Sequence, residues 1–141
     1  MPVNGLFNTT MELLGKSIDL RARNHNHLSA NIANAETPGY TPTKLSFENE
    51  LKDALHDKKK GMSNQDANPR HIPLKASGSG LAGVRGKLIE TPADNPGKDG
   101  NSVEIENEMA RMAENQIMYN ADVQILAKQF EELKAAIKGT N

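Results

Sequence analysis

The chain has 141 residues, no cysteine, and a formal net charge of −1 from 17 basic and 18 acidic side chains. The lack of cysteine excludes disulfides, thiolate metal sites and cysteine nucleophiles. The balanced charge argues against nucleic-acid binding. No apolar run approaches the ~18 residues of a membrane span, so direct membrane insertion is not expected. The first residues also lack the features of a secretory signal.

Residues 1–40 predict a long N-terminal helix that ends in an Asn-rich turn. The helix should begin near Thr9, which forms a capping box with Glu12. Its inward positions alternate by three and four residues: Phe7, Met11, Leu14, Ile18, Arg21, His25, Leu28, Ile32 and Ala35. The run Thr37-Pro38-Gly39-Tyr40 should stop the helix, because Pro38 disfavours helical backbone at Thr37 and Gly39 suits the third position of a type II turn.

The middle of the chain is poor in core-forming residues. Residues 41–60 predict a short helical segment whose apolar positions are Leu45, Phe47, Leu51 and Leu55. Residues 61–100 hold 7 of the 11 glycines and 4 of the 7 prolines. This composition predicts an irregular loop or a small β excursion, with extended pieces at 71–75 and 84–90.

Residues 101–141 predict a second long helix, spanning 102–138, with Asn101 as its cap and Gly139 at its end. Its stripe keeps a 3.5-residue repeat: Ile105, Met109, Met112, Gln116, Tyr119, Val123, Leu126, Phe130, Leu133 and Ile137. Such a repeat is typical of helices that pack lengthwise against other helices. The predicted fold is therefore mainly α. Its two long terminal helices pair as a coiled-coil-like unit around an irregular Gly/Pro-rich middle that can hold short strands.

The sequence offers no positive case for catalysis, a cofactor or a metal. Residues 78–83 spell the glycine pattern of a dinucleotide site, but no good strand precedes it and no helix opens after it, so a flexible loop is favoured. The four histidines, His25, His27, His56 and His71, lack metal-ligand spacing. His25 falls on the inward stripe, where its ring could bond a partner helix. We therefore expect that the protein is not an enzyme.

Asn31 and Asn34 stand at the end of the first stripe, where helix carbonyls lack partners within the helix. Two interpretations stay open from the residues alone. The amides could simply stop the helix and lead into the turn. Alternatively, they could bond the free carbonyls or a neighbouring subunit.

The segment resembles the signature of the flagellar rod and hook protein family, in which an Asn-x-x-Asn-x-x-Thr-x-Gly-Tyr element closes the first helix. The matching residues here, with the proline inside the element, are Asn31, Asn34, Thr37, Pro38, Gly39 and Tyr40. Residues 19–23, 45–48, 99–101 and 112–116, with Tyr119, are similar to proximal members of that family. The resemblance is weak over residues 61–98.

The resemblance implies a structural subunit of the proximal rod, with paired terminal helices that pack with many other subunits into a tube. The assembly seam would comprise Leu14, Ile18, Leu28, Ile32, Met109, Met112, Tyr119, Val123, Leu126, Phe130, Leu133 and Ile137. Implied partners are other copies of the chain, FlgC-like rod subunits, a FliE-like adapter at the rod base and the flagellar type III export apparatus. Phe47 and Leu51 match a Phe-x-x-x-apolar element proposed to dock such subunits at the export gate, although Phe7 and Met11 match it too.

The family resemblance also implies a location in the basal body, reached from the cytoplasm without a cleaved signal. The alternative is a cytoplasmic coiled-coil adapter or export chaperone of the flagellar system, which would use the same helical stripes without joining the rod.

Overall fold

The computed structural model describes residues 9–61 and 80–139. In chain order the elements are α1 (Thr9–Ala33), β1 (Thr43–Ser46), α2 (Glu48–Gly61), the short 3₁₀ turn η1 (Leu81–Gly83), β2 (Lys87–Glu90) and α3 (Ile105–Lys138). The fold is mainly α, with two long terminal helices and a short two-stranded sheet, as predicted. Phe7, His71 and the expected extended piece at 71–75 lie outside the described residues.

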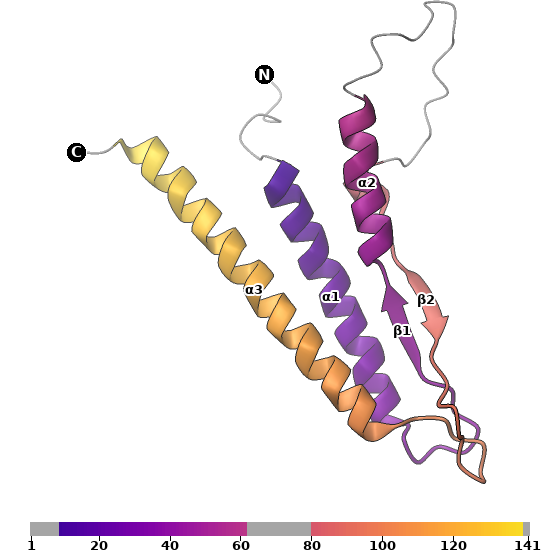
Figure 1. The fold of residues 1–141 in the computed structure, drawn as a ribbon. Helices are drawn as coiled ribbons and strands as arrows, with labels where there is room; N and C mark the ends of the chain where they lie inside the picture. Colours follow the sequence, from indigo (N-terminus) through magenta and orange to yellow (C-terminus); the bar gives the residue numbers. More distant parts are fainter. Residues whose placement is uncertain (1–8, 62–79, 140–141) are drawn as a thin grey trace, which may run out of the picture.

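The two long helices run antiparallel (Figure 1). Ser17 of α1 bonds Asp122 of α3, whereas Asn31 bonds Glu108, so positions rise along one helix as they fall along the other. The two helices lie closest where α1 ends and α3 begins, and they spread apart toward the end of α3 (Figure 1). At about 1.5 Å per residue, the 34 residues of α3 extend about 51 Å.

Two predicted helix ends are confirmed. The helix α1 ends before the turn, in which Tyr40 N donates to Thr37 O at 3.3 Å and Gly39 has a φ of 70°. This is the type II pattern, because glycine tolerates positive φ at the third position. At the other end, α3 stops at Lys138 and Gly139 follows with a φ of 71°.

The expected start of α3 is wrong. The helix begins at Ile105 after Glu104, and the Asn101 side chain does not cap it. Instead, Asn101 Nδ2 donates to the carbonyls of Asn34 and Thr37, at 3.0 and 2.6 Å. Carbonyls at a helix end lack partners within the helix, and residues 99–102 lie against the turn that follows α1. Asn101 therefore holds the turn that follows the first helix rather than capping the last helix.

The prediction of a helical segment over 41–60 is wrong in its first part. Leu45 lies in the strand β1, and only Leu51 and Leu55 lie in the helix α2. β1 pairs antiparallel with β2, from Thr43 opposite Glu90 to Ser46 opposite Lys87. β2 falls inside the extended piece predicted at 84–90. Pairing with a distant strand outweighs the weak local preference of residues 43–46.

The apolar core lies between α1, the sheet and α2, and it does not lie between the two long helices. Its buried residues are Leu20, Leu45, Phe47 and Val84, with Leu51 and Ala54 packed against them. Gly86, with a φ of 72°, crosses this cluster so closely that a Cβ there would stand 2.9 Å from Leu45 Cγ. The contact between the long helices must therefore be explained by other side chains.

Candidate assembly interface

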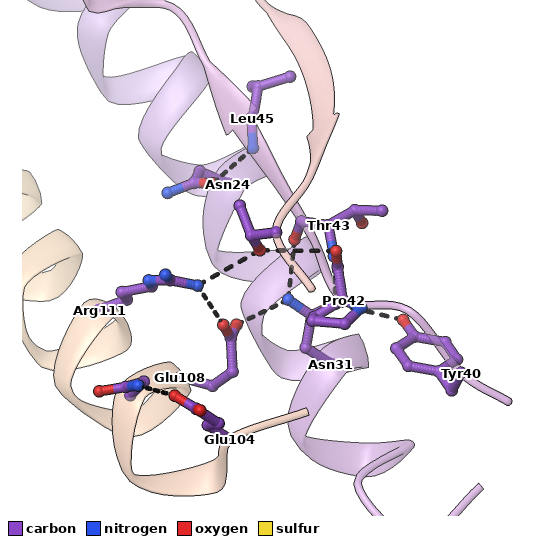
Figure 2. A network of polar contacts seen from close by, with 11 residues as sticks. Asn24, Asn31, Tyr40, Pro42, Thr43, Leu45, Glu104, Glu108 and Arg111 are labelled. Atoms are coloured by element: carbon purple, nitrogen blue, oxygen red, sulfur yellow. Dashed lines mark hydrogen bonds and ion pairs between the residues drawn. The ribbon is translucent and has the colours of Figure 1, made fainter. Parts of the chain in front are cut away.

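Asn31 joins three parts of the fold at the end of α1, and its side chain is fully buried. Its Nδ2 donates to Thr43 O at 2.8 Å and to Glu108 Oε2 at 2.6 Å. Its Oδ1 accepts from Thr43 N at 3.0 Å and from the Tyr40 hydroxyl at 3.2 Å. Figure 2 shows the amide between the strand and α3. All of its bonding capacity is used, which offsets the cost of burying it.

Asparagines of α1 also protect one edge of the sheet. β1 pairs with β2 on one side, which leaves the N–H groups of Thr43 and Leu45 on the other side. Asn31 Oδ1 accepts the first, and Asn24 Oδ1 accepts the second at 2.9 Å (Figure 2). An open strand edge can pair with other chains. Asn24 and Asn31 therefore close this edge against unwanted pairing.

The long helices meet along a row of polar residues that we call the polar ladder. It consists of Ser17, Asn24 and Asn31 on α1 and Asp122, Asn115 and Glu108 on α3. Ser17 Oγ donates to Asp122 Oδ2 at 2.6 Å, and Asn24 Nδ2 donates to Asn115 Oδ1 at 3.3 Å. Positions seven apart lie on one face of a helix in a coiled-coil arrangement. The three rungs therefore fix both the direction and the register of the pair.

Further polar contacts tie the ladder to its surroundings. Arg21 Nε lies 3.1 Å from Asp122 Oδ2, and its guanidinium stands 5.5 Å from the centre of the Phe47 ring. Asn115 Nδ2 donates to Arg21 O at 3.0 Å. Arg111 Nη1 lies 2.5 Å from Glu108 Oε1 and donates to Thr91 Oγ1 (Figure 2). Glu108 is only 1% exposed, so these donors compensate a charge that would otherwise be costly to bury.

The segments that carry the family resemblance meet in space. Asn34 Nδ2 bonds Ala30 O, and the Thr37 hydroxyl donates to Asn34 Oδ1. Ser102 N donates to Tyr40 O, and Gly39 N donates to Asp99 O. The partners of Asn34 and Asn31 distinguish the two interpretations of these asparagines. Asn34 bonds a helix carbonyl, as one of them expected, whereas Asn31 reaches past its helix to β1 and α3.

The predicted assembly seam divides into three groups by exposure. Leu14 and Leu28 are buried. A second group is half-buried: Ile18, Ile32, Met112, Tyr119, Leu126 and Leu133. A third group on α3 is exposed, and we call it the outer row: Met109, Val123, Phe130 and Ile137. The polar ladder lies against α1, so the predicted seam on α3 is divided between half-buried positions and the exposed outer row.

Reasoning from apolar periodicity missed the residues of the polar ladder other than Asn31, which the signature at the end of the first helix had singled out. Ser17, Asn24 and Asn31 recur every seven residues, as do Glu108, Asn115 and Asp122. The same heptad spacing that revealed the apolar stripes could have revealed them, had polar residues been counted as well. Asn101 was noticed, but only for a local capping role.

The two residues matching the export-gate element lie at the core. Phe47 is 1% exposed and Leu51 is half-buried against the core cluster. Neither side chain is presented as a docking surface in the folded chain. Of the other matching pair, Met11 is buried, and Phe7 lies outside the described residues.

The described residues show no group suited to metal binding and no helix suited to membrane crossing. In the described ranges 9–61 and 80–139, no group of three or more His, Asp or Glu side chains is placed to hold a metal. None of the helices in these ranges combines the length and apolarity needed to cross a bilayer. In the described part of the glycine pattern, η1 is followed by extended backbone at Val84 rather than by a helix. The Nδ1 atom of His25 is buried without a hydrogen-bond partner in the described structure.

These features define a class of protein before any comparison is made. Two long antiparallel helices are held in register by polar contacts, and a row of large apolar side chains on one of them is left exposed. The fold is that of a mainly helical structural protein.

Known proteins identify the family within that class. The chain is 31% identical over 129 residues to the flagellar basal body rod protein FlgB of Salmonella typhimurium, with 89% of this chain and 91% of that protein covered. It is 30% identical over 129 residues to FlgB of Escherichia coli. It is 29% identical over 137 residues to FlgB of Buchnera aphidicola, covering 97% of each chain. No protein-family model matches the chain. The chain belongs to the FlgB family of flagellar basal body rod proteins.

Proposed function

We propose that this chain is a structural, non-enzymatic subunit of the proximal rod, and that it polymerises through its terminal helices to form part of the drive shaft. Its family places it among basal body rod proteins. The observation that carries the finer proposal is the division of α3 into two faces. One face bonds α1 through polar residues, and another face carries the exposed apolar side chains of Met109, Val123 and Ile137.

Exposed apolar residues in a row are expected of an interface rather than of a finished surface. Val123 is 38% exposed and Ile137 is 70% exposed, although both are large aliphatic residues. Large exposed apolar patches on a folded protein mark interaction sites. Burial of such a row between subunits would contribute about 25 cal/mol for each Å² removed from water.

The partners that we propose follow the position of a proximal rod subunit. They are other copies of this chain, FlgC-like rod subunits, a FliE-like adapter at the base and the type III export apparatus that delivers the chain uncleaved. The pairing of α1 with α3 supports this proposal, because it leaves one face of α3 for lateral neighbours.

Because Phe47 is buried, the proposed docking at the export gate requires that the chain reach the gate unfolded. A gate that binds Phe47 and Leu51 must meet the chain before the core forms, since folding removes Phe47 from solvent. Phe47→Ala should then reduce export even when the chain is kept unfolded. Leu20→Ala is the matched control, because Leu20 belongs to the same core cluster but lies outside the element. Equal export of both variants would contradict the docking role.

The function is tested by isolating intact hook–basal bodies and measuring this chain by mass spectrometry after washes with detergent and salt. Stoichiometric recovery with the N-terminus uncleaved is the expected result. Recovery only from the soluble cytoplasm would favour the alternative, in which the chain is an adapter or export chaperone. The helical pairing would stand in that case, but the rod assignment would not.

A further inference from the structure

Arg21 stands where the helix pair meets the apolar core. Its Nε donates to Asp122 Oδ2 at 3.1 Å, and the same oxygen accepts the Ser17 hydroxyl at 2.6 Å. The guanidinium carbon also lies over the Phe47 ring, 5.5 Å from the ring centre. The Arg21 side chain therefore contacts a rung of the polar ladder and a core residue at once.

These three side chains are largely shielded from water. Those of Arg21 and Asp122 are 13% and 19% exposed, and Phe47 is 1% exposed. Charge pairs on an open surface contribute little, because water and salt screen them. A cation over an aromatic face is also attracted more strongly where water is removed. The position of each group therefore affects the energy of the other two.

The packing around Arg21 leaves its side chain room to turn. Arg21 lines three hollows, of about 450, 250 and 230 Å³. Glu48, at the start of α2, lines the two larger hollows with it, whereas Glu114 of α3 lines only the largest. A long side chain keeps its rotamer freedom unless specific contacts remove it. Steric packing alone therefore does not choose Asp122 over Glu48 as the partner of Arg21.

We infer that Arg21 is the positioning residue through which the apolar core fixes α3 against α1. The Phe47 ring holds the guanidinium toward Asp122 and away from Glu48. The ring offers its electron-rich face to the cation only when it is packed in the core. The bond from Arg21 to α3 therefore depends on the core being formed.

This dependence gives the folding of the chain an order. Before Phe47 is packed, Arg21 has two carboxylate partners and Asp122 has no selected cation. The consequence for assembly rests on the proposed function, in which Phe47 is also part of the export-gate element. The ring that a gate would bind is the ring that later selects the partner of Arg21. The two long helices would then reach their final register only after the gate releases the chain.

A double-mutant cycle with Arg21→Gln and Asp122→Asn measures the selected bond in the free chain. In the natural chain the two changes should be non-additive by about fivefold in the unfolding equilibrium constant. In the Phe47→Leu chain this factor should fall to about one, because the ring is gone. Val84→Ala is the matched control, since Val84 belongs to the same core cluster but lines none of the three hollows. In that chain the factor should stay near its natural value.

Glu48→Gln separates selection of a partner from general loosening of the core. In the Phe47→Leu chain it removes the competing charge, so the factor for Arg21 and Asp122 should return toward about fivefold. The Phe47 N–H donates to Glu48 Oε2 at 3.2 Å, and a glutamine oxygen can keep that bond. A merely structural role of Phe47 predicts no rescue by this change.

Proton NMR of the natural chain gives a reading that needs no variant. The Arg21 side-chain protons should be shifted upfield by the Phe47 ring, and the shift should vanish in Phe47→Leu or Phe47→Met, whichever folds. Three results would overturn the inference: no ring shift in the natural chain, equal factors in the Phe47→Leu and Val84→Ala chains, or no rescue by Glu48→Gln. Recovery of the natural chain from basal bodies tests the rod function separately, so either proposal can fail alone.

Discussion

Asn31 Nδ2 lies 2.6 Å from Glu108 Oε2, and this hydrogen bond joins the end of the first long helix to the beginning of the last. Both side chains are almost fully buried, at 0% and 1% exposure. The same amide also holds the strand β1 through both backbone groups of Thr43. The first asparagine of the family signature is therefore the point at which helix, strand and second helix are locked together.

Asn31→Ala should destabilise the folded chain by roughly 2–4 kcal/mol, because it leaves buried partners without hydrogen bonds. The free energy of unfolding, measured by denaturant titration, checks this. Asn34→Ala is the matched control and should cost below about 1 kcal/mol, since the bonds of Asn34 to Ala30 O and Thr37 are exposed. Equal losses in the two variants would contradict the central role of Asn31.

The polar ladder should show measurable coupling between its two helices. A double-mutant cycle with Ser17→Ala and Asp122→Ala should give a coupling energy of about 0.5–1.5 kcal/mol, the range of a net hydrogen bond. The exposed pair Gln116 and Asn120, which bond within α3, serves as the comparison and should give a few tenths of a kcal/mol. Coupling near zero at Ser17 and Asp122 would mean that the helices pair without the ladder.

Two glycines with similar backbone angles should respond differently to alanine. Gly39→Ala should cost about 1 kcal/mol, because φ is 70° but the space around the new Cβ is open. Gly86→Ala should cost about 2–4 kcal/mol, because the new Cβ also meets Leu45 and Phe47. Thermal unfolding of the two variants checks the order, and a larger loss at Gly39 would be inconsistent with the core as described.

Gly15 offers a test in the stabilising direction. It lies inside α1, and nothing stands within 4 Å of a Cβ built there. Gly15→Ala should raise the stability of the free chain by about 1 kcal/mol, because alanine is the better helix former. A loss of stability on denaturant unfolding would show that α1 is constrained at this point.

Seam substitutions should separate assembly from folding. Val123→Asp should block incorporation into basal bodies while changing the free energy of unfolding by no more than about 0.5 kcal/mol, as for an exposed residue. Leu126→Asp and Ile18→Asp should also block assembly and leave the chain soluble, although their half-buried positions imply some loss of stability. Gln124→Asp is the exposed control that should assemble normally. Natural rod formation by the seam variants would refute the seam assignment.

Much of this fold was readable from local patterns. The heptad spacing predicted two long helices, and Pro38 with Gly39 predicted the turn that closes the first, because these signals depend on backbone chemistry within a few residues. Gly139 likewise marked the end of α3. The family resemblance rested on short segments such as 31–40, whose side chains now prove to be in contact.

Only the tertiary structure decided how those helices are used. Leu45 lies in a strand because β1 pairs with β2, which is more than forty residues away in the sequence. Asn101 bonds the turn after α1 rather than capping the start of α3, because the chain returns to that turn at this point. The hydrogen bonds that set the register of the two helices are polar side-chain contacts, which apolar periodicity does not reveal. Periodicity in the sequence determined that α3 has an apolar face, but the position of α1 determined which part of that face is half-buried and which part is exposed.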